Sequence, residues 1–271
     1  MRPDRVESGN PRAPIAWPEA DPVGEPPSWF RESLERAEIQ LEPGEEDLLC
    51  RFLGLMLAAN RVANLTAIRN LDDAWRKHML DALLVLPLVA SVEPKEPGAR
   101  PCIIDVGSGG GVPAVPLACV CPQVDFTLLE ATGKKAAFLE HAAASLGLSN
   151  VTVRQERSER AARDRGVNTG AGRSGGLRDA FDASLCRALG AMRVAAELTL
   201  PFVRPQGVGV FVKGERAEEE LREAEHALNS LAAGHLLNHR TETATIVVVR
   251  KHAATPRAYP REDGMPKRSP L

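Results

Sequence analysis

The sequence predicts an α/β fold in which a mainly parallel, seven-stranded sheet follows a smaller helical subdomain. From residue 99 onward, seven short apolar runs alternate with helical patterns, which is typical of βαβ units with helices on both faces of a sheet. No helical pattern separates the last two runs, 235–239 and 245–249. We therefore expect these two runs to form a hairpin and to place one antiparallel strand in the sheet.

Composition indicates an ordinary globular protein. The chain has 271 residues, of which 44% are hydrophobic and 26% charged, so it can bury a sizeable core. Its longest apolar run, 83–90, is too short to cross a membrane, and the N-terminus lacks the pattern of a secretory signal. These features predict a cytoplasmic protein that makes no contact with a membrane.

Charge and cysteine content limit the other classes of partner. The five cysteines are scattered among apolar neighbours, so we expect buried thiols and no metal site. A net charge of −2 provides no overall attraction to nucleic acid. Residues 151–178 nevertheless hold seven arginines against three acidic residues. This run is either a solvated surface or a patch that faces a polyanion.

The N-terminal part reads as a leader and three helices. Residues 1–27 contain seven prolines and are predicted to be disordered. In the helical subdomain, 28–98, Ser28 is a candidate N-cap for a helix that reaches about Gln40. Pro43 opens a second helix with a wide apolar face, and a third helix is expected from about Asp72 to Val89.

The second domain, 99–252, carries the alternating pattern, and residues 253–271 read as a flexible tail. Helices are expected over 134–146, where Gly147 ends the pattern, in a segment that ends near 202, and over 215–231. A Gly/Arg-rich insertion at 168–178 reads as a loop. The remaining expected strands are 102–106, 124–129, 151–153, 181–186 and 207–212.

Four glycines in five positions follow the first strand, in the stretch IDVGSGGGVP from Ile104 to Pro113. Glycine loses the most backbone freedom on folding, so such a cluster indicates that a ligand approaches the backbone closely. A dinucleotide motif fits residues 109–114, but it begins two residues late. The pattern D-x-G-x-G-x-G fits every position of 105–111 and favours S-adenosylmethionine. Glu130, which closes the second strand, suits the ribose hydroxyls of either ligand.

Seven short motifs in chain order make the sequence similar to a known family. That family is the bacterial 16S rRNA guanine-N7 methyltransferase G, also called glucose-inhibited division protein B. The resemblance covers about residues 60–251, and seven matches in order are far more specific than one. The motifs are NLTAIR (64–69), HMLD (78–81), IDVGSGGGVP (104–113), LEATGKK (129–135), RSE (157–159), CRA (186–188) and VKG (212–214).

The resemblance implies a Rossmann-like S-adenosylmethionine-dependent methyltransferase. The expected reaction methylates N7 of a guanine in the 530 loop of 16S rRNA, position 527 in common rRNA numbering. N7 carries a lone pair and no proton, so in-line attack needs no general base. The implied partner is 16S rRNA or the small ribosomal subunit, and we expect a monomer.

The motif itself assigns Asp105, Gly107, Gly109, Gly111 and Glu130 to the donor pocket. By resemblance the pocket also takes Val112, Ala131, Thr132, Ser158, Glu159 and Arg187, with Ser158 and Glu159 beside the adenine. The same resemblance places functional polar side chains at Asn64, Arg157, Arg187 and Lys213. Methylation makes the guanine ring cationic. Arg157, Arg187 and Lys213 are therefore expected to bind O6, phosphate or the donor carboxylate rather than N7. The family usually has alanine at the position of Ser158. The insertion at 168–178 is longer than the resemblance leads us to expect, and it is either an extra RNA contact or an idle loop.

Three other functions stay open on the sequence alone. A methyltransferase could act on a small molecule or a protein, with the helical subdomain as a cap over the pocket. An NAD-dependent oxidoreductase would use the same glycines for a pyrophosphate. A non-catalytic RNA-binding protein could keep the fold without methyl transfer.

Overall fold

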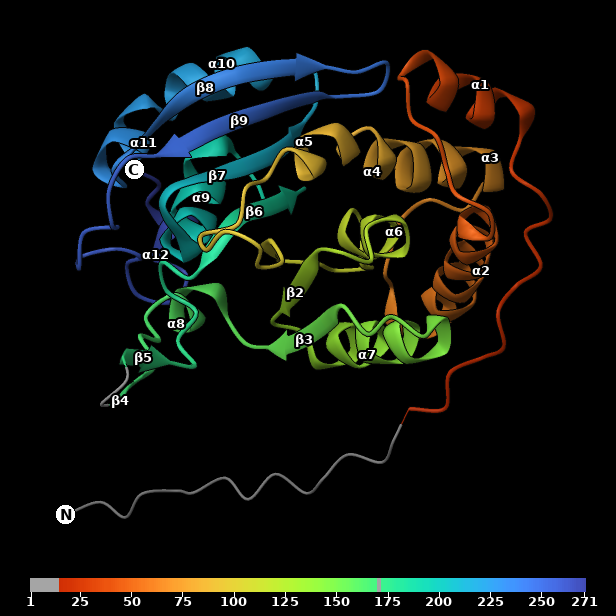
Figure 1. Cartoon of the computed structure of the whole chain (residues 1–271), viewed down its shortest axis with the longest axis horizontal. Coiled ribbons are helices and arrows are strands. Elements are labelled where there is room, and N and C mark those ends of the chain that lie inside the picture. Colours follow the sequence, from red (N-terminus) through yellow and green to blue (C-terminus); the bar gives the residue numbers. More distant parts are fainter. Residues whose placement is uncertain (1–14, 170–171) are drawn as a thin grey trace.

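Seven strands form one sheet in the computed structural model, which describes residues 15–169 and 172–271. The strand order is β3-β2-β1-β6-β7-β9-β8, and β9 is antiparallel to both of its neighbours (Figure 1). The predicted sheet, its hairpin and its single antiparallel strand are therefore confirmed. The strands are β1 (Cys102–Val106), β2 (Asp125–Glu130), β3 (Val151–Gln155), β6 (Phe181–Arg187), β7 (Val203–Lys213), β8 (Ala233–Arg240) and β9 (Thr245–Lys251).

The N-terminal helices differ from the sequence expectation at their ends. Ser28 is the first residue of its helix and makes no capping bond, and the predicted third helix is broken into short segments. Asn70 caps the first of these by accepting from the amide of Asp73 at 3.1 Å, and Pro87 lies in the first turn of the last. The segments are α1 (Ser28–Arg36), α2 (Glu45–Ala63), α3 (Leu71–Ala74), the π-helix η1 (Trp75–Leu80), α4 (Asp81–Leu83) and α5 (Leu86–Ala90).

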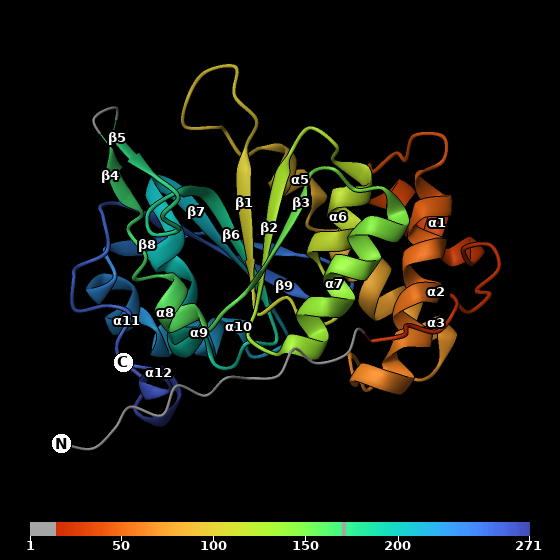
Figure 2. The same ribbon diagram turned by 90° about the horizontal axis from the view of Figure 1, so that it is seen from below.

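Helices cover both faces of the sheet. Figure 2 shows α6 and α7 with the N-terminal helices on one side, and α8, α9, α10 and α11 on the other. The expected helix 215–231 is interrupted at Ala224, so it forms two short helices. The bounds are α6 (Ala114–Val120), α7 (Gly133–Leu146), α8 (Ser158–Ala161), α9 (Met192–Thr199), the 3₁₀ turn η2 (Leu200–Phe202), α10 (Ala217–Glu223), α11 (Glu225–Ser230) and α12 (Met265–Arg268).

Strand β9 shows how the sequence separates the two faces. Val247 and Val249 pack into the core beneath α9 and α11, whereas Ile246 and Val248 pack into the core on the opposite face. This alternation follows from the two-residue period of a strand. The core that contains Ile246 and Val248 also contains Phe52 of α2. The helical subdomain therefore shares its hydrophobic core with this face of the sheet.

Both terminal segments pack more closely than the sequence suggests. Trp17 stacks on His141 with ring centroids 5.9 Å apart, and the amide of Asp21 donates to the carbonyl of Gly54 at 3.1 Å. The expectation of a disordered leader is thus wrong for residues 15–27, while residues 1–14 lie outside the described part. The C-terminal tail is also packed, because Arg261 pairs with the fully buried Glu197. Aromatic stacking, a backbone hydrogen bond and a buried ion pair provide these contacts.

The Gly/Arg-rich insertion contains a short antiparallel pair that the sequence did not predict. Strand β4 (Val167–Thr169) pairs with β5 (Gly172–Ser174), and residues 170–171 between them lie outside the description. Within the described residues, no helix is both long and apolar enough to cross a membrane.

Asp182 provides a test of how the amino ends of the neighbouring strands β1 and β6 are held together. Its carboxylate is 4% exposed and accepts from the amide of Cys102 at 2.8 Å and from Arg204 Nε at 2.7 Å. We expect Asp182→Ala to lower the free energy of unfolding by about 2 kcal/mol, because it removes the acceptor of the Cys102 amide and of the partly buried Arg204 guanidinium. Urea denaturation measures the change. Arg216→Ala, which breaks the exposed pair with Glu219, serves as the control and should leave the midpoint unchanged; equal shifts would contradict the assignment.

Candidate active site

A left-handed glycine turn follows β1. The φ angles of Gly107, Gly109 and Gly111 are +74°, +57° and +88°, a region that other residues rarely adopt. The amides of Gly107 and Ser108 both donate to the carbonyl of Leu129, at 2.8 and 3.2 Å. The end of β2 therefore holds the turn in place beside the carboxyl end of β1.

The glycines have different roles. A Cβ at Gly107 would lie 2.7 Å from Cδ1 of Leu189, at the edge of a cavity. A Cβ at Gly111 would lie 2.7 Å from Val115 and 3.0 Å from Leu139, which belong to α6 and α7. Gly111 thus permits close packing of two helices and does not line the cavity, in contrast to its expected place in the donor pocket.

The cavity brings together residues from the ends of β1, β2 and β3. Its volume is about 260 Å³, and β2 and α8 supply much of its polar wall. Eight of the residues expected in the site line it: Gly107, Gly109, Glu130, Ala131, Thr132, Arg157, Ser158 and Glu159. Asp105, Val112, Arg187, Lys213 and Asn64 are not among its lining residues.

Glu130 ties two loops of the cavity together. One carboxylate oxygen accepts from the amide of Gly109 at 2.9 Å, and the other accepts from the amide of Thr132 at 2.7 Å. The side chain is 7% exposed, so its orientation is fixed by these bonds. Each ionised carboxylate oxygen has a further lone pair, which leaves Glu130 able to accept from two ligand hydroxyls.

Asp105 lies directly beneath the turn and is 1% exposed. Its pKa is raised to about 7, mainly by burial and to a smaller extent by the nearby Glu130, while Ser108 and Arg187 act in the opposite direction. Its Oδ2 atom has no hydrogen-bond partner within the described residues. Buried polar atoms usually have a hydrogen-bond partner, so Oδ2 is an unsatisfied acceptor directly behind the glycine turn.

The segment after β3 forms another wall. The Ser158 hydroxyl donates to the carbonyl of Leu198, and the Glu159 carboxylate accepts from the amide of Gly264 at 2.9 Å. Glu159 is 6% exposed, whereas Arg157 is exposed at the start of α8. Ser158 and Glu159 therefore connect the cavity to α9 and to the C-terminal segment.

Arg187 ends β6 within a buried polar cluster that reaches the N-terminal helices. Its Nη2 atom lies 3.7 Å from Oδ2 of Asp81, and burial lowers the pKa of the guanidinium. His78 contacts the Thr66 hydroxyl through Nε2 at 2.9 Å, and burial together with the charge of Arg187 lowers its pKa to about 4. Nη1 of Arg187 is buried and has no partner among the described residues.

Lys213 and Asn64 hold backbone segments in the structure. Lys213 Nζ donates to the carbonyl of Gly190 at 2.7 Å and to Glu220 at 2.8 Å, so its charge is already paired. Asn64 ends α2 with a left-handed φ of 49°, and the adjacent Leu65 packs against Gly110. Both residues position loops around the glycine turn.

Sequence reasoning missed several residues that line the cavity. Lys135 follows the LEATG segment and Leu189 follows CRA, so the matching motifs offered a signal for both. Gly264 and Lys267 had no such signal, because their segment shows no strand or helix pattern of its own.

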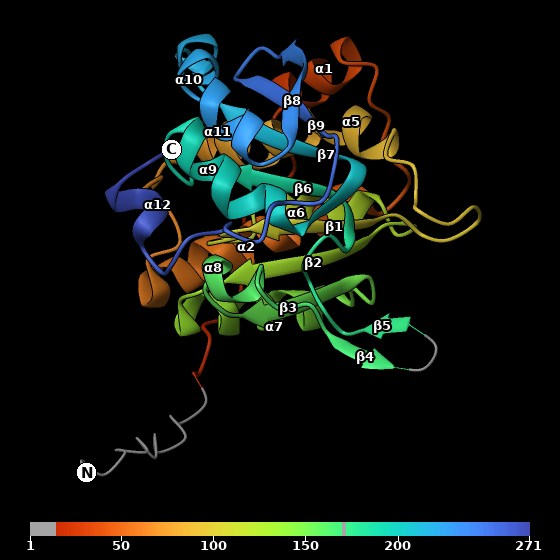
Figure 3. The same ribbon diagram turned by 90° about the vertical axis from the view of Figure 1, so that its left-hand side faces the viewer.

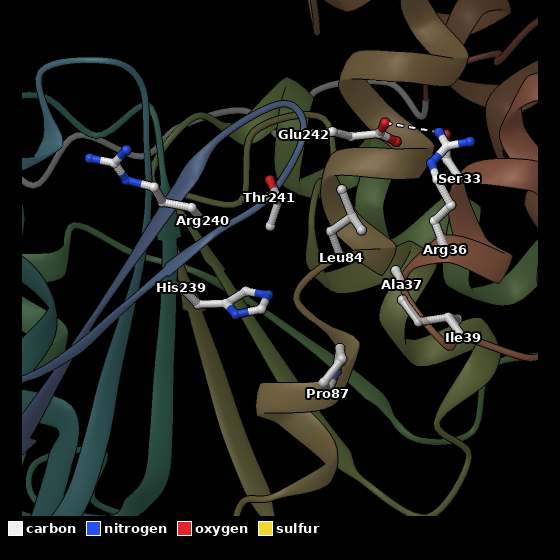
Figure 4. Close-up of a pocket in the computed structure, with 10 residues that line it drawn as sticks. All are labelled: Ser33, Arg36, Ala37, Ile39, Leu84, Pro87, His239, Arg240, Thr241 and Glu242. Carbon is white, nitrogen blue, oxygen red and sulfur yellow. Dashed lines mark hydrogen bonds and ion pairs between the residues drawn. The ribbon is translucent and has the colours of Figure 1, made fainter.

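A second cavity, of about 300 Å³, lies between α1, the α4–α5 region and the turn from β8 to β9 (Figure 4). Arg36 pairs there with Glu242 at 3.0 Å and donates to the Ser33 hydroxyl at 2.8 Å. Arg240 points away and pairs with Glu218. Its arginines are thus paired, and none of the expected site residues lines it. The described residues contain no group of three or more His, Cys, Asp or Glu that could hold a metal ion.

Comparison with known proteins identifies the family. The family model for GidB, rRNA small subunit methyltransferase G, matches residues 45–245. A relative named ribosomal RNA small subunit methyltransferase G, from Sorangium cellulosum, is 42% identical over 92% of this chain and 97% of its own length. A relative of the same name from Moorella thermoacetica is 35% identical over 86% of this chain and 93% of its own length.

A solved structure supports the fold. A putative O-methyltransferase from Klebsiella pneumoniae aligns with a TM-score of 0.50 and 17% identity over 83% of this chain and 97% of that one. Together with the glycine turn, the acid at the end of β2 and the sheet order, these matches show that the chain belongs to the rRNA small subunit methyltransferase G (GidB) family.

Proposed function

We propose that the protein transfers a methyl group from S-adenosylmethionine to N7 of a guanine in the 530 loop of 16S rRNA, position 527 in common numbering. The observation that carries this proposal is the cavity in which the left-handed glycine turn meets Glu130. Membership of the family supports small-subunit rRNA as the substrate.

The residues present fit the donor. The turn offers bare backbone at Gly107, where a Cβ would be obstructed, and Glu130 offers lone pairs for the two ribose hydroxyls. Asp105 does not line the cavity, and its buried, unpartnered Oδ2 would act on the donor's ammonium group from behind the glycine turn. Ser158 and Glu159 are assigned to the adenine side. When bound, S-adenosylmethionine supplies an electrophilic methyl group on its sulfonium.

The protein's own groups act by binding and orientation. Guanine N7 has a lone pair and no proton, so attack requires no general base. His78 agrees with this, because it is buried, neutral above about pH 4 and engaged with Thr66. Holding nucleophile and methyl group in line contributes on the order of 7–11 kcal/mol when alignment is good.

Arg187 is the cation that we assign to the target base. It lies at the end of β6, carries an unpartnered Nη1 and is held by Asp81, which keeps the guanidinium oriented. We assign it to O6 or phosphate, because a cation at N7 would oppose the positive charge that develops on the ring. Lys213 acts by fixing the loop at Gly190. Arg157, exposed at the cavity, and Asn64, exposed beside the turn, are assigned to contacts with RNA, and Val112 supports the turn.

We further propose that the protein acts as a monomer on the small ribosomal subunit. Because the substrate is ribosomal RNA, we also propose a cytoplasmic location.

The decisive experiment is transfer of labelled methyl from S-adenosylmethionine to small ribosomal subunits from a strain that lacks this protein. We expect label in 7-methylguanosine at a single position of the 530 loop. A donor that binds while subunits and naked 16S rRNA stay unlabelled would reject the RNA assignment. Label in a small molecule or a protein would establish the alternative acceptor.

Gly107→Ala tests whether the glycine turn binds the donor, and a second glycine variant serves as the matched control. We expect donor affinity to fall about tenfold, because the added Cβ displaces Leu189 into the cavity. Gly98→Ala introduces the same left-handed strain, at φ +81°, where nothing lies within 4 Å. Both variants should lose about 1 kcal/mol of stability, but calorimetric titration should show weakened donor binding for Gly107→Ala alone. Equal affinities would place the donor elsewhere.

Asp105 predicts a pH dependence of donor binding. With a pKa of about 7, the carboxyl group of the free protein is largely protonated below that pH and charged above it. The charged form is the one that attracts an ammonium group, so affinity should rise roughly tenfold from pH 5.5 to 7. Asp105→Asn should bind more weakly and show a flat profile over this range. A wild-type profile that is equally flat would exclude Asp105 from the donor site.

A further inference from the structure

The C-terminal segment, defined here as Tyr259–Arg268, is anchored by a buried ion pair. Arg261 donates to the Glu197 carboxylate through its backbone amide at 2.8 Å and through Nη2 at 2.6 Å. Glu197 is 0% exposed, so this pairing satisfies a charge inside the protein. A carboxylate buried beneath the segment indicates that the segment belongs to the folded structure.

A second buried cation holds the chain that leads into this segment. Arg178 donates to the carbonyls of Thr255 at 2.7 Å and Tyr259 at 2.8 Å, and also to the carbonyl of Ala162 at 3.0 Å. Residues 255–259 are therefore fixed against the end of α8. The C-terminal segment starts from a defined position next to the donor cavity.

The segment then reaches the cavity itself. The amide of Gly264 donates to Glu159 at 2.9 Å, and both Gly264 and Lys267 line the cavity that contains Gly107 and Glu130. Figure 3 shows α12 next to α8 and α9. Arg160 and Arg261 are paired with Asp263 and Glu197 and so hold the segment. Lys267 is exposed, lines the cavity and has no ion-pair partner among the described residues.

We propose that the C-terminal segment is a wall of the donor site and that Lys267 binds the adenosyl group by donating a hydrogen bond to the adenine ring. The inference rests on the proposed function in one respect, that the donor is S-adenosylmethionine. Gly264 bonds to Glu159, on the wall assigned to the adenine. Adenine presents ring nitrogens as acceptors, and the lysine ammonium carries three donors and no acceptor.

The test uses the full chain, S-adenosylhomocysteine and calorimetric titration, without RNA. Lys267→Met should weaken binding about tenfold, the loss expected for a hydrogen bond from a charged donor. Lys134→Met removes the same charge from an exposed residue of α7 that does not line the cavity, and it should leave affinity unchanged. If Lys267→Met binds as tightly as the wild type, the proposal is overturned.

Analogues that lack one ring nitrogen identify the contact. The 1-deaza, 3-deaza and 7-deaza forms of S-adenosylhomocysteine are each compared with the parent compound. For the wild-type protein, one analogue should bind more weakly than the parent compound. For Lys267→Met, the same analogue and the parent compound should bind with nearly equal affinity. Losses that are additive for all three analogues would overturn the adenine contact. Unchanged donor affinity with a raised KM for ribosomal subunits would likewise overturn it, and would assign Lys267 to an RNA phosphate.

Hydrogen exchange tests the wall without altering any residue. S-adenosylhomocysteine should slow exchange of amides in 259–268 as well as in the glycine turn. Protection of the turn with an unchanged C-terminal segment would contradict the proposal. A wild-type protein that binds no S-adenosylhomocysteine would instead reject the proposed function, so the two failures are distinguishable.

Discussion

The carboxyl end of β2 holds the structure of the site together. The Leu129 carbonyl accepts two amides of the glycine turn, and the Glu130 carboxylate accepts a third from Gly109. These bonds depend on the parallel register that pairs Val106 with Leu129. Because the turn adopts left-handed backbone angles, it needs glycine to form and neighbouring acceptors to keep one conformation. The donor cavity follows from this single constraint.

Burial sets the electrostatics of the site. Asp105, His78 and Arg187 are removed from water, and in each case burial is the main cause of the pKa shift towards the neutral form. The cluster links β1 and β6 with the N-terminal helices, because Asp81 lies beside Arg187. A neutral histidine suits a reaction that requires no proton transfer. In the proposed function, the cation and the unpartnered carboxylate oxygen supply orientation instead.

Two segments outside the alternating pattern complete the molecule. Residues 15–27 cover α2 and α7, and the C-terminal segment covers α8 and α9 beside the cavity. Both are held by a few strong contacts and contain little regular structure. The buried pair between Glu197 and Arg261 illustrates this, since loss of either partner would leave a charge uncompensated. Such contacts let an irregular segment contribute to a site as effectively as a helix.

The sequence by itself determined the sheet, the glycine turn and the family. Strand periodicity, the acid two residues before the first glycine and Glu130 are local signals, because each depends on neighbours in the chain. Eight expected residues therefore lie around one cavity. Tertiary structure decided what those residues do: Gly111 spaces two helices, Lys213 is neutralised by Glu220, and Glu159 receives the amide of Gly264. Their partners are up to 105 positions away. No periodicity records such contacts, because burial and pairing across the fold arise only when distant segments pack together.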